Sequence, residues 1–212
     1  MKEYVIIDLE MCSVNSEEQK MAFKAGKELI QIGAVLMNEA FQITDTFSTY
    51  VAPEYGKLDR YITRLTGITT PDITDAPSAA EALSSFSEWL PKDATIVAWS
   101  ENDEYQIRCE LDGKNISIPR LSNSFGHWID CQDLFGERMH SHRKYRLSEA
   151  LLISGLWSDG RAHDALIDAI NTAHLFAKLN KSDSVRADNY YYMNEIESAS
   201  VIFNPFARLC TV

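Results

Sequence analysis

The sequence lacks the features that mark membrane proteins, disulfide-rich proteins and zinc proteins. No run of 18 or more apolar residues occurs, so we expect no membrane-spanning helix. The four cysteines are widely spaced and form no CxxC pair, which favours reduced thiols over a disulfide framework or a zinc site. Asp8 comes too early in the chain for the apolar core of a signal peptide to precede it, so we expect a cytoplasmic protein.

Positive charge is also scarce. The 212 residues include 20 Lys and Arg against 31 Asp and Glu, a formal net charge of −11. This balance argues against strong electrostatic binding of many nucleic-acid phosphates. It does not exclude an enzyme that acts on nucleic acid, because bound metal ions can neutralise a site locally. The length and the 45% apolar content predict one sizeable domain with an appendage.

What the sequence does contain is an apolar strand, Tyr4 to Glu10, that ends in two acids. Alternate side chains of a strand point to one face, so Asp8 and Glu10 project together. Two neighbouring carboxylates repel, and burial makes their charge costlier unless a cation compensates. A site of oxygen ligands suits Mg²⁺ or Mn²⁺. The alternative is a strand that ends at the surface, where both acids are solvated.

The order of the remaining elements predicts an α/β fold. Two further strands and the turn at Asn38-Glu39 form an antiparallel hairpin, beside which the first strand pairs. Strands and helices then alternate, which predicts a mixed sheet with helices on both faces. The expected strands are Glu28–Met37, Phe41–Val51, Thr95–Trp99 and, more weakly, Ser124–Asp130. The expected helices are Leu58–Leu65, Ser78–Leu90, Asn102–Leu111, one from about Gln132, Leu147–Ser154 and Asp164–Leu179.

Acids recur where these elements begin or end. Asp103 follows the strand that ends at Trp99 and begins a helix, where a capping role is the alternative to a metal-binding one. Asp168 lies in the first turns of the last helix, on the side shared by two leucines, which is unusual for a merely solvated acid. His163 stands just ahead of that helix, where an ordinary surface or capping residue is the alternative.

Together these residues resemble the DEDDh family of 3′→5′ exonucleases, closest to the KapD and enhanced-RNAi type. The matching motifs are Ile7-Asp8-Leu9-Glu10, Trp99-Ser100-Glu101-Asn102-Asp103 and His163-Asp164-Ala165-Leu166-Ile167-Asp168, with supporting stretches Leu65-Thr66-Gly67-Ile68-Thr69 and Leu147-Ser148-Glu149-Ala150. The resemblance covers about residues 3–180 and implies an RNase H-like domain over residues 1–180. Residues 181–212 fall outside it, and we expect this extension to pack on the domain or to form a dimer contact.

The resemblance also implies a mechanism. Asp8, Glu10, Asp103 and Asp168 would hold two Mg²⁺ ions, for which Mn²⁺ can substitute, and Asp8 would bridge them. His163 would be the general base that takes a proton from the attacking water. The substrate would be the 3′ end of a single-stranded nucleic acid, with RNA or short oligonucleotides favoured over DNA on the subgroup resemblance alone. The products would be nucleoside 5′-monophosphates.

Candidate substrate contacts are less specific. Leu65, Thr66 and Ile68 are expected by resemblance to wedge against the last base and sugar. Met11 and Cys12 replace a Thr that many relatives carry beside the terminal nucleotide. Stacking on a base is a further possibility at two aromatic residues, Trp99 and Tyr105, although core packing is the alternative for the tryptophan.

A basic run, Arg138 to Arg146, contrasts with the acidic chain. Arg143 and Lys144 are candidates to meet backbone phosphates, and a solvated basic loop is the alternative. Asp130 is expected to cap the helix that follows it. Other functions remain open at this stage: a catalytically silent nucleic-acid-binding or regulatory module of the same fold, or a polymerase-associated proofreading subunit. The chain would be a monomer or a homodimer.

Overall fold

The computed structural model describes residues 2–23, 25–181 and 185. Most of the predicted extension, 181–212, therefore lies outside the described residues. The strands are β1 (Tyr4–Ser13), β2 (Lys27–Met37), β3 (Ile43–Tyr50), β4 (Thr95–Ala98) and β5 (Ile129–Asp130). The helices are α1 (Glu17–Ala22), α2 (Arg60–Thr66), α3 (Thr70–Thr74), α4 (Ala79–Trp89), α5 (Glu101–Gly113), α6 (Pro119–Ser122), α7 (Cys131–Arg138), α8 (Leu147–Ile153) and α9 (Ala165–Lys181).

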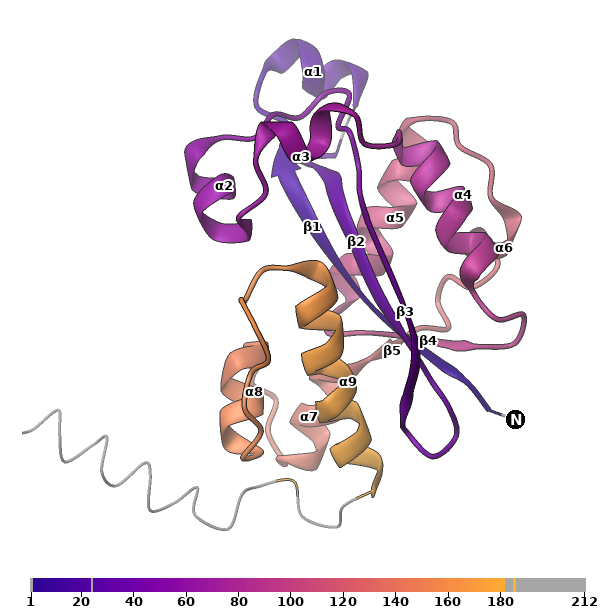
Figure 1. The fold of residues 1–212 in the computed structure, drawn as a ribbon, viewed down its shortest axis with the longest axis vertical. Coiled ribbons are helices and arrows are strands. Elements are labelled where there is room, and N and C mark those ends of the chain that lie inside the picture. The colour runs from indigo at the N-terminus through magenta and orange to yellow at the C-terminus, as the bar shows by residue number, and fades with distance from the viewer. Residues whose placement is uncertain (1, 24, 182–184, 186–212) are drawn as a thin grey trace, which may run out of the picture.

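The five strands form one sheet in the order β3-β2-β1-β4-β5 (Figure 1). The first three strands pair antiparallel, and β4 joins β1 in parallel, as does β5 with β4. This arrangement confirms the predicted mixed sheet with three leading antiparallel strands. The strand β1 lies at its centre and runs on to Ser13, so Asp8 and Glu10 lie within a strand that is paired on both sides rather than at its end.

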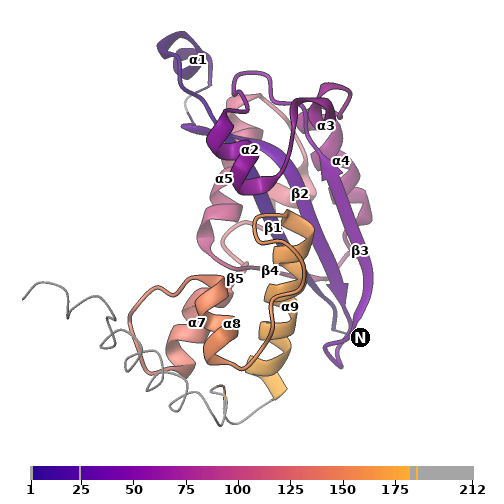
Figure 2. The same cartoon turned by 60° about the vertical axis from the view of Figure 1, so that its left-hand side comes forward.

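Helices cover both faces of the sheet, as predicted, and Figure 2 shows the two groups apart. Val5, Ile7 and Leu9 of β1 point toward α4 and α5, where they join the buried cluster around Phe86 and Ile107. Tyr4 and Ile6 point the other way, into the cluster formed with α7, α8 and α9. The alternation of strand side chains therefore sends Asp8 and Glu10 to the α9 face.

A β-bulge interrupts the pairing of β1 with β2. Glu10 pairs with Gln31, whereas Met11 pairs with Leu29, so Ile30 is an extra residue on β2. Ile30 is buried in a separate small cluster under α2 and α3, with Cys12, Ile62, Ile68 and Ile73 as its other buried members. The bulge thus separates the part of the sheet that carries Asp8 and Glu10 from the part that supports α2.

A buried ion cluster fixes the segment that leads from β3 toward α2. Glu28 of β2 accepts hydrogen bonds from the backbone N–H groups of Glu54 (2.7 Å) and Tyr55 (2.8 Å). Lys114, at the end of α5, pairs with Glu28 at 2.6 Å and with Glu110 at 2.9 Å, and the side chains of all three are at most 4% exposed. Satisfied hydrogen bonds and opposite charges offset the cost of burying these groups.

Some element boundaries differ from those predicted. The strand predicted over Ser124–Asp130 is only the two-residue β5, because a turn occupies the residues before it. The helix α3, which is absent from the expected elements, begins where Thr69 and Asp72 form a capping box. The expected cap at Asp130 is confirmed, and Ser78 caps α4 in a capping box with Glu81. Among the described residues, no helix is long and apolar enough to cross a membrane.

Candidate active site

The site is built first by β1, which presents Asp8 and Glu10 beside the start of α9. Asp8 is half-buried, and Glu10 is 8% exposed. Their β2 partners in the antiparallel pairing are Gly33 and Gln31. Both partners also contact the start of α9.

Gly33 lets the first turn of α9 lie directly on the sheet. A Cβ at this position would overlap the backbone N of Leu166 and the backbone C of Ala165. Gln31, buried beside it, accepts a hydrogen bond at Oε1 from the backbone N–H of Ala165 (3.2 Å). The close approach at Gly33 therefore brings Asp168 up to the carboxylates of β1.

Substituting Gly33 with alanine is expected to displace the start of α9, because backbone atoms cannot yield as a flexible side chain would. We expect a loss of stability of about 1–3 kcal/mol. A shift of about 1 Å at Asp168 would lower turnover by about 10²-fold. Thermal unfolding and initial rates would measure both effects. Gly26→Ala is the matched control, since no atom lies within 4 Å of its Cβ position, and equal behaviour of the two variants would contradict this account.

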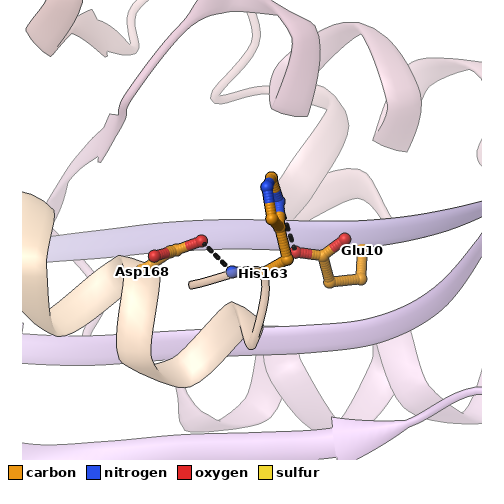
Figure 3. A group of neighbouring side chains, drawn as sticks. All are labelled: Glu10, His163 and Asp168. Carbon is orange, nitrogen blue, oxygen red and sulfur yellow. Dashed lines mark hydrogen bonds and ion pairs between the residues drawn. The ribbon is translucent and has the colours of Figure 1, made fainter. Parts of the chain in front are cut away.

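Asp168 and His163 face Glu10 across the start of α9 (Figure 3). The backbone N–H of His163 donates to Asp168 Oδ2 at 2.8 Å, and His163 Nδ1 lies 3.8 Å from Glu10 Oε1. His163 has a φ of 63°, the left-handed region that a non-glycine residue rarely adopts. The side chain of His163 is 51% exposed. The imidazole thus stands at the solvent side of the two acids.

Asp103 comes from the third element, α5, in its first turn after β4. It is 6% exposed, and backbone N–H groups of Leu9, Asp103 and Ser100 stabilise its carboxylate. The N-cap of α5 is Ser100, so Asp103 lies in the first turn without being the cap itself. Its charge is close enough to Asp8 to raise the pKa of Asp8.

Burial raises the pKa values of all four acids, and the charges of the neighbouring acids add to this at Asp8 and Glu10. Burial, followed by the charges of Asp103 and Asp168, raises the pKa of Asp8 well above its ordinary value. Burial raises the pKa of Glu10 to about 8, and the charge of Asp168 adds to it. Burial also raises the pKa of Asp103 to about 7 and, by a smaller amount, that of Asp168. Without a cation the site holds more negative charge than it can stabilise.

The stability of the metal-free protein is therefore expected to fall as pH rises from about 4.5 to about 8. In that window the unfolded chain releases protons that Glu10 and Asp103 retain in the folded state, so alkali favours unfolding. Melting temperatures in EDTA from pH 5 to pH 8.5 would measure the slope, and Mg²⁺ should raise them more at pH 8 than at pH 6. Glu10→Gln should flatten the slope. An unchanged slope in that variant would contradict the assignment.

A cavity of about 950 Å³ opens beside these residues. Its wall includes Asp8, Glu10, His163 and Asp168, whereas the buried Asp103 does not border it. The group Glu10, His163 and Asp168 offers ligand atoms within 4.8 Å of one another. The two carboxylates of this group are held close and short of compensating charge, and their oxygen atoms fit a hard divalent cation.

The predicted substrate contacts are divided. Met11, Cys12, Leu65, Trp99 and Lys144 border the cavity. Trp99 also packs on Phe135, with ring centroids 6.5 Å apart, so it contributes to the core as well. Thr66 and Ile68 are buried instead, and the Thr66 hydroxyl accepts from the Ile68 backbone N–H at 3.1 Å. Ile68 belongs to the small cluster around Ile30.

Of the remaining predicted contacts, Tyr105 lies away from the cavity wall, and the two basic residues are paired with acids. Tyr105 is 64% exposed on α5 and does not border the cavity. Arg143 pairs with Glu149 at 2.6 Å, and Lys144 is paired with Asp133 although it borders the cavity.

Among the cavity residues that sequence reasoning missed, two have side chains suited to binding a nucleotide. Tyr61, on α2, borders the cavity and is 68% exposed. It stands four residues before Leu65, one helical turn away on the same face, which is the signal that could have found it. Arg146 closes the basic run and also borders the cavity, where no carboxylate of the described residues pairs with it.

Comparison with known proteins adds independent findings. A family model described as Exonuclease (RNase_T) matches residues 5–176. ERI1 exoribonuclease 2 of Danio rerio is 29% identical over 179 residues, which cover 73% of this chain and 32% of the relative. DNA polymerase III subunit epsilon of Aquifex aeolicus is 30% identical over 179 residues, which cover 83% of this chain and 79% of the relative.

A solved structure confirms the fold. The nuclease domain of 3′hExo, described as a DEDDh family member bound to rAMP, superposes with a TM-score of 0.73 at 23% identity, covering 88% of this chain and 95% of that chain. The chain spans about a third of the length of the ERI1 exoribonuclease 2 relative from Danio rerio.

Proposed function

The chain belongs to the exonuclease family, and we propose that it is itself a metal-dependent 3′→5′ exonuclease that releases nucleoside 5′-monophosphates from single-stranded nucleic acid. The observation that carries this proposal is the meeting of Asp8, Glu10 and Asp168 with His163 at one cavity. Asp103 of α5 lies close enough to raise the pKa of Asp8. The functional unit is the domain of residues 1–180, and two Mg²⁺ ions are the cofactor, with Mn²⁺ able to replace them.

The role of each residue follows from its position. Asp8, Glu10, Asp103 and Asp168 would hold the cations, with Asp8 central because all three other acids act on its pKa. Bound cations supply neutralisation of the charge that develops on the phosphate and the leaving oxygen. His163 turns Nδ1 toward Glu10, so Nε2 is the ring nitrogen available to take a proton from the attacking water.

The terminal nucleotide would lie against α2. Leu65 offers an apolar contact to the sugar and base, and the exposed ring of Tyr61 offers a stacking surface that accepts any base. The similar nuclease domain of 3′hExo was solved with rAMP bound, which agrees with release of a nucleoside monophosphate. The likeness to ERI1 exoribonuclease 2 favours RNA as the substrate class.

The direct test is hydrolysis of a 5′-labelled single-stranded oligonucleotide in RNA and DNA form, with Mg²⁺ or Mn²⁺. We expect a ladder that shortens from the 3′ end, faster on RNA, and no product in EDTA. Internal cuts without a ladder, or products that carry a 3′-phosphate, would refute the proposal.

The relation to DNA polymerase III subunit epsilon supports a second candidate, a proofreading subunit. The two candidates share their chemistry and differ in partner. Full turnover by the isolated chain would favour a free-standing enzyme. Turnover that requires a polymerase would favour the proofreading subunit, and nucleotide binding without turnover would favour a silent binding module.

Substituting Arg146 with alanine is expected to weaken oligonucleotide binding by about tenfold and to reduce its salt dependence by about one phosphate contact. Arg146 borders the cavity, whereas Arg143 is engaged with Glu149. Arg143→Ala is therefore the matched control and should change binding less. Fluorescence anisotropy over a range of salt concentrations would measure both variants, and a larger effect of Arg143→Ala would reverse the assignment.

A further inference from the structure

The loop that carries His163 is tied to the helix that borders the nucleotide side of the cavity. Arg161, two residues before His163, donates from Nη2 to the backbone carbonyl of Arg64 at 2.7 Å and to that of Leu65 at 3.4 Å. Carbonyls in the last turn of a helix have no partner within the helix. A cation there also faces the negative end of the helix dipole, so the contact is favourable on both counts.

A second feature of the chain makes room for this contact. Gly67 ends α2 with a φ of 79°, the left-handed conformation that favours glycine. A Cβ at Gly67 would overlap Nη1 of Arg161. The guanidinium group thus occupies the space left by the missing side chain.

The loop is also held at a second point, on α9. The backbone N–H of Asp159 donates to Oδ1 of Asn171 at 2.8 Å, and Asn171 is buried. That anchor fixes the loop to the helix bearing Asp168. The contact of Arg161 differs because it crosses to α2, whose Leu65 borders the cavity.

We propose that Arg161 is a positioning residue that couples the wall of the nucleotide pocket to the general base. By fixing the loop to the C-terminal end of α2, it holds His163 in its left-handed conformation over Glu10 when a nucleotide lies against Leu65. This inference rests on the proposed exonuclease function. It assigns Arg161 no contact with substrate, and its effect passes through His163.

The test is a double-mutant cycle on the full chain, with a single-stranded RNA oligonucleotide and Mn²⁺. Arg161→Ala is expected to lower kcat by about tenfold with little change in KM, whereas Arg161→Lys keeps most of the rate because it can still donate to Arg64. In a His163→Ala background, Arg161→Ala should cost less than about twofold. Gly67→Ala, whose Cβ would displace the guanidinium group of Arg161, should lower kcat by a similar factor. The double variant of Gly67→Ala and Arg161→Ala should lose no more than Arg161→Ala alone.

Arg120→Ala is the matched control, because Arg120 donates to the backbone carbonyl of Ser87 at 2.9 Å, away from the cavity. It should leave kcat unchanged. A full tenfold loss from Arg161→Ala in the His163→Ala background would overturn the proposal, as would a wild-type rate for Arg161→Ala.

Hydrogen exchange separates this inference from the proposed function. The amides of residues 160–163 should exchange faster in Arg161→Ala than in the wild-type chain, whether or not the chain hydrolyses RNA. Unchanged exchange would overturn the role of Arg161 even if the protein proves to be an exonuclease.

Discussion

Replacing Asp8 with asparagine is expected to reduce turnover by at least about 10³-fold while making the metal-free protein more stable. Cations contribute several kcal/mol to stabilisation of the transition state, and each 1.36 kcal/mol is about tenfold in rate. Asp8 is the carboxylate on which the other acids converge, and burial and their charges raise its pKa. An amide of the same shape removes that repulsion together with the site's affinity for cations.

The measurement pairs turnover with unfolding. Initial rates with Mn²⁺ and melting temperatures in EDTA at pH 8 would be recorded for wild type, Asp8→Asn and Asp112→Asn, in which an exposed carboxylate of α5 is changed instead. The expected pattern is loss of turnover with a higher melting temperature for Asp8→Asn alone. A lower melting temperature would mean that Asp8 supports the fold rather than a cation site.

Replacing His163 with alanine is expected to lower turnover by about 10²–10⁴-fold and to leave metal binding largely intact. The imidazole is half-exposed and lies 3.8 Å from Glu10, so it can reach a water at the cavity without being needed to hold the acids together. The backbone bond from His163 to Asp168 does not depend on the side chain, so the acids should keep their places.

Metal binding, followed by the Mg²⁺-dependent rise in melting temperature, would separate the two effects. His127→Ala is the control, since His127 is an exposed histidine outside the cavity wall. Near wild-type turnover of His163→Ala at saturating Mn²⁺ would remove this residue from the role of general base.

Local chemistry made the core of this site predictable from sequence. The two acids of β1 share a face because a strand alternates its side chains, and that face is the one covered by α9. The side of α9 that carries Asp168 is indeed not a solvated one, since Leu175 and Leu179 are both buried. These inferences depend on the period of a helix or strand, which the sequence displays directly.

Contacts between distant segments were not predictable in the same way. A glycine in a strand does not reveal that the first turn of a helix will rest on it, as α9 does on Gly33. The residues that line the cavity near α2 also depend on tertiary packing. Thr66 and Ile68 match a family motif, yet both are buried. Tyr61 borders the cavity although it lies outside that motif. The sequence of the basic run likewise did not indicate which of its Lys and Arg side chains would pair with neighbouring acids.

The β-bulge at Ile30 has a consequence for how such an enzyme can diversify. The helices α2 and α3 rest on their own small cluster beyond the bulge, while the carboxylates rest on the two large ones. Substitutions within the small cluster would therefore reshape the α2 wall without touching the residues packed around the carboxylates. On the proposed function they would change which 3′ nucleotide fits, provided that the carbonyls of Arg64 and Leu65 stay in place for Arg161.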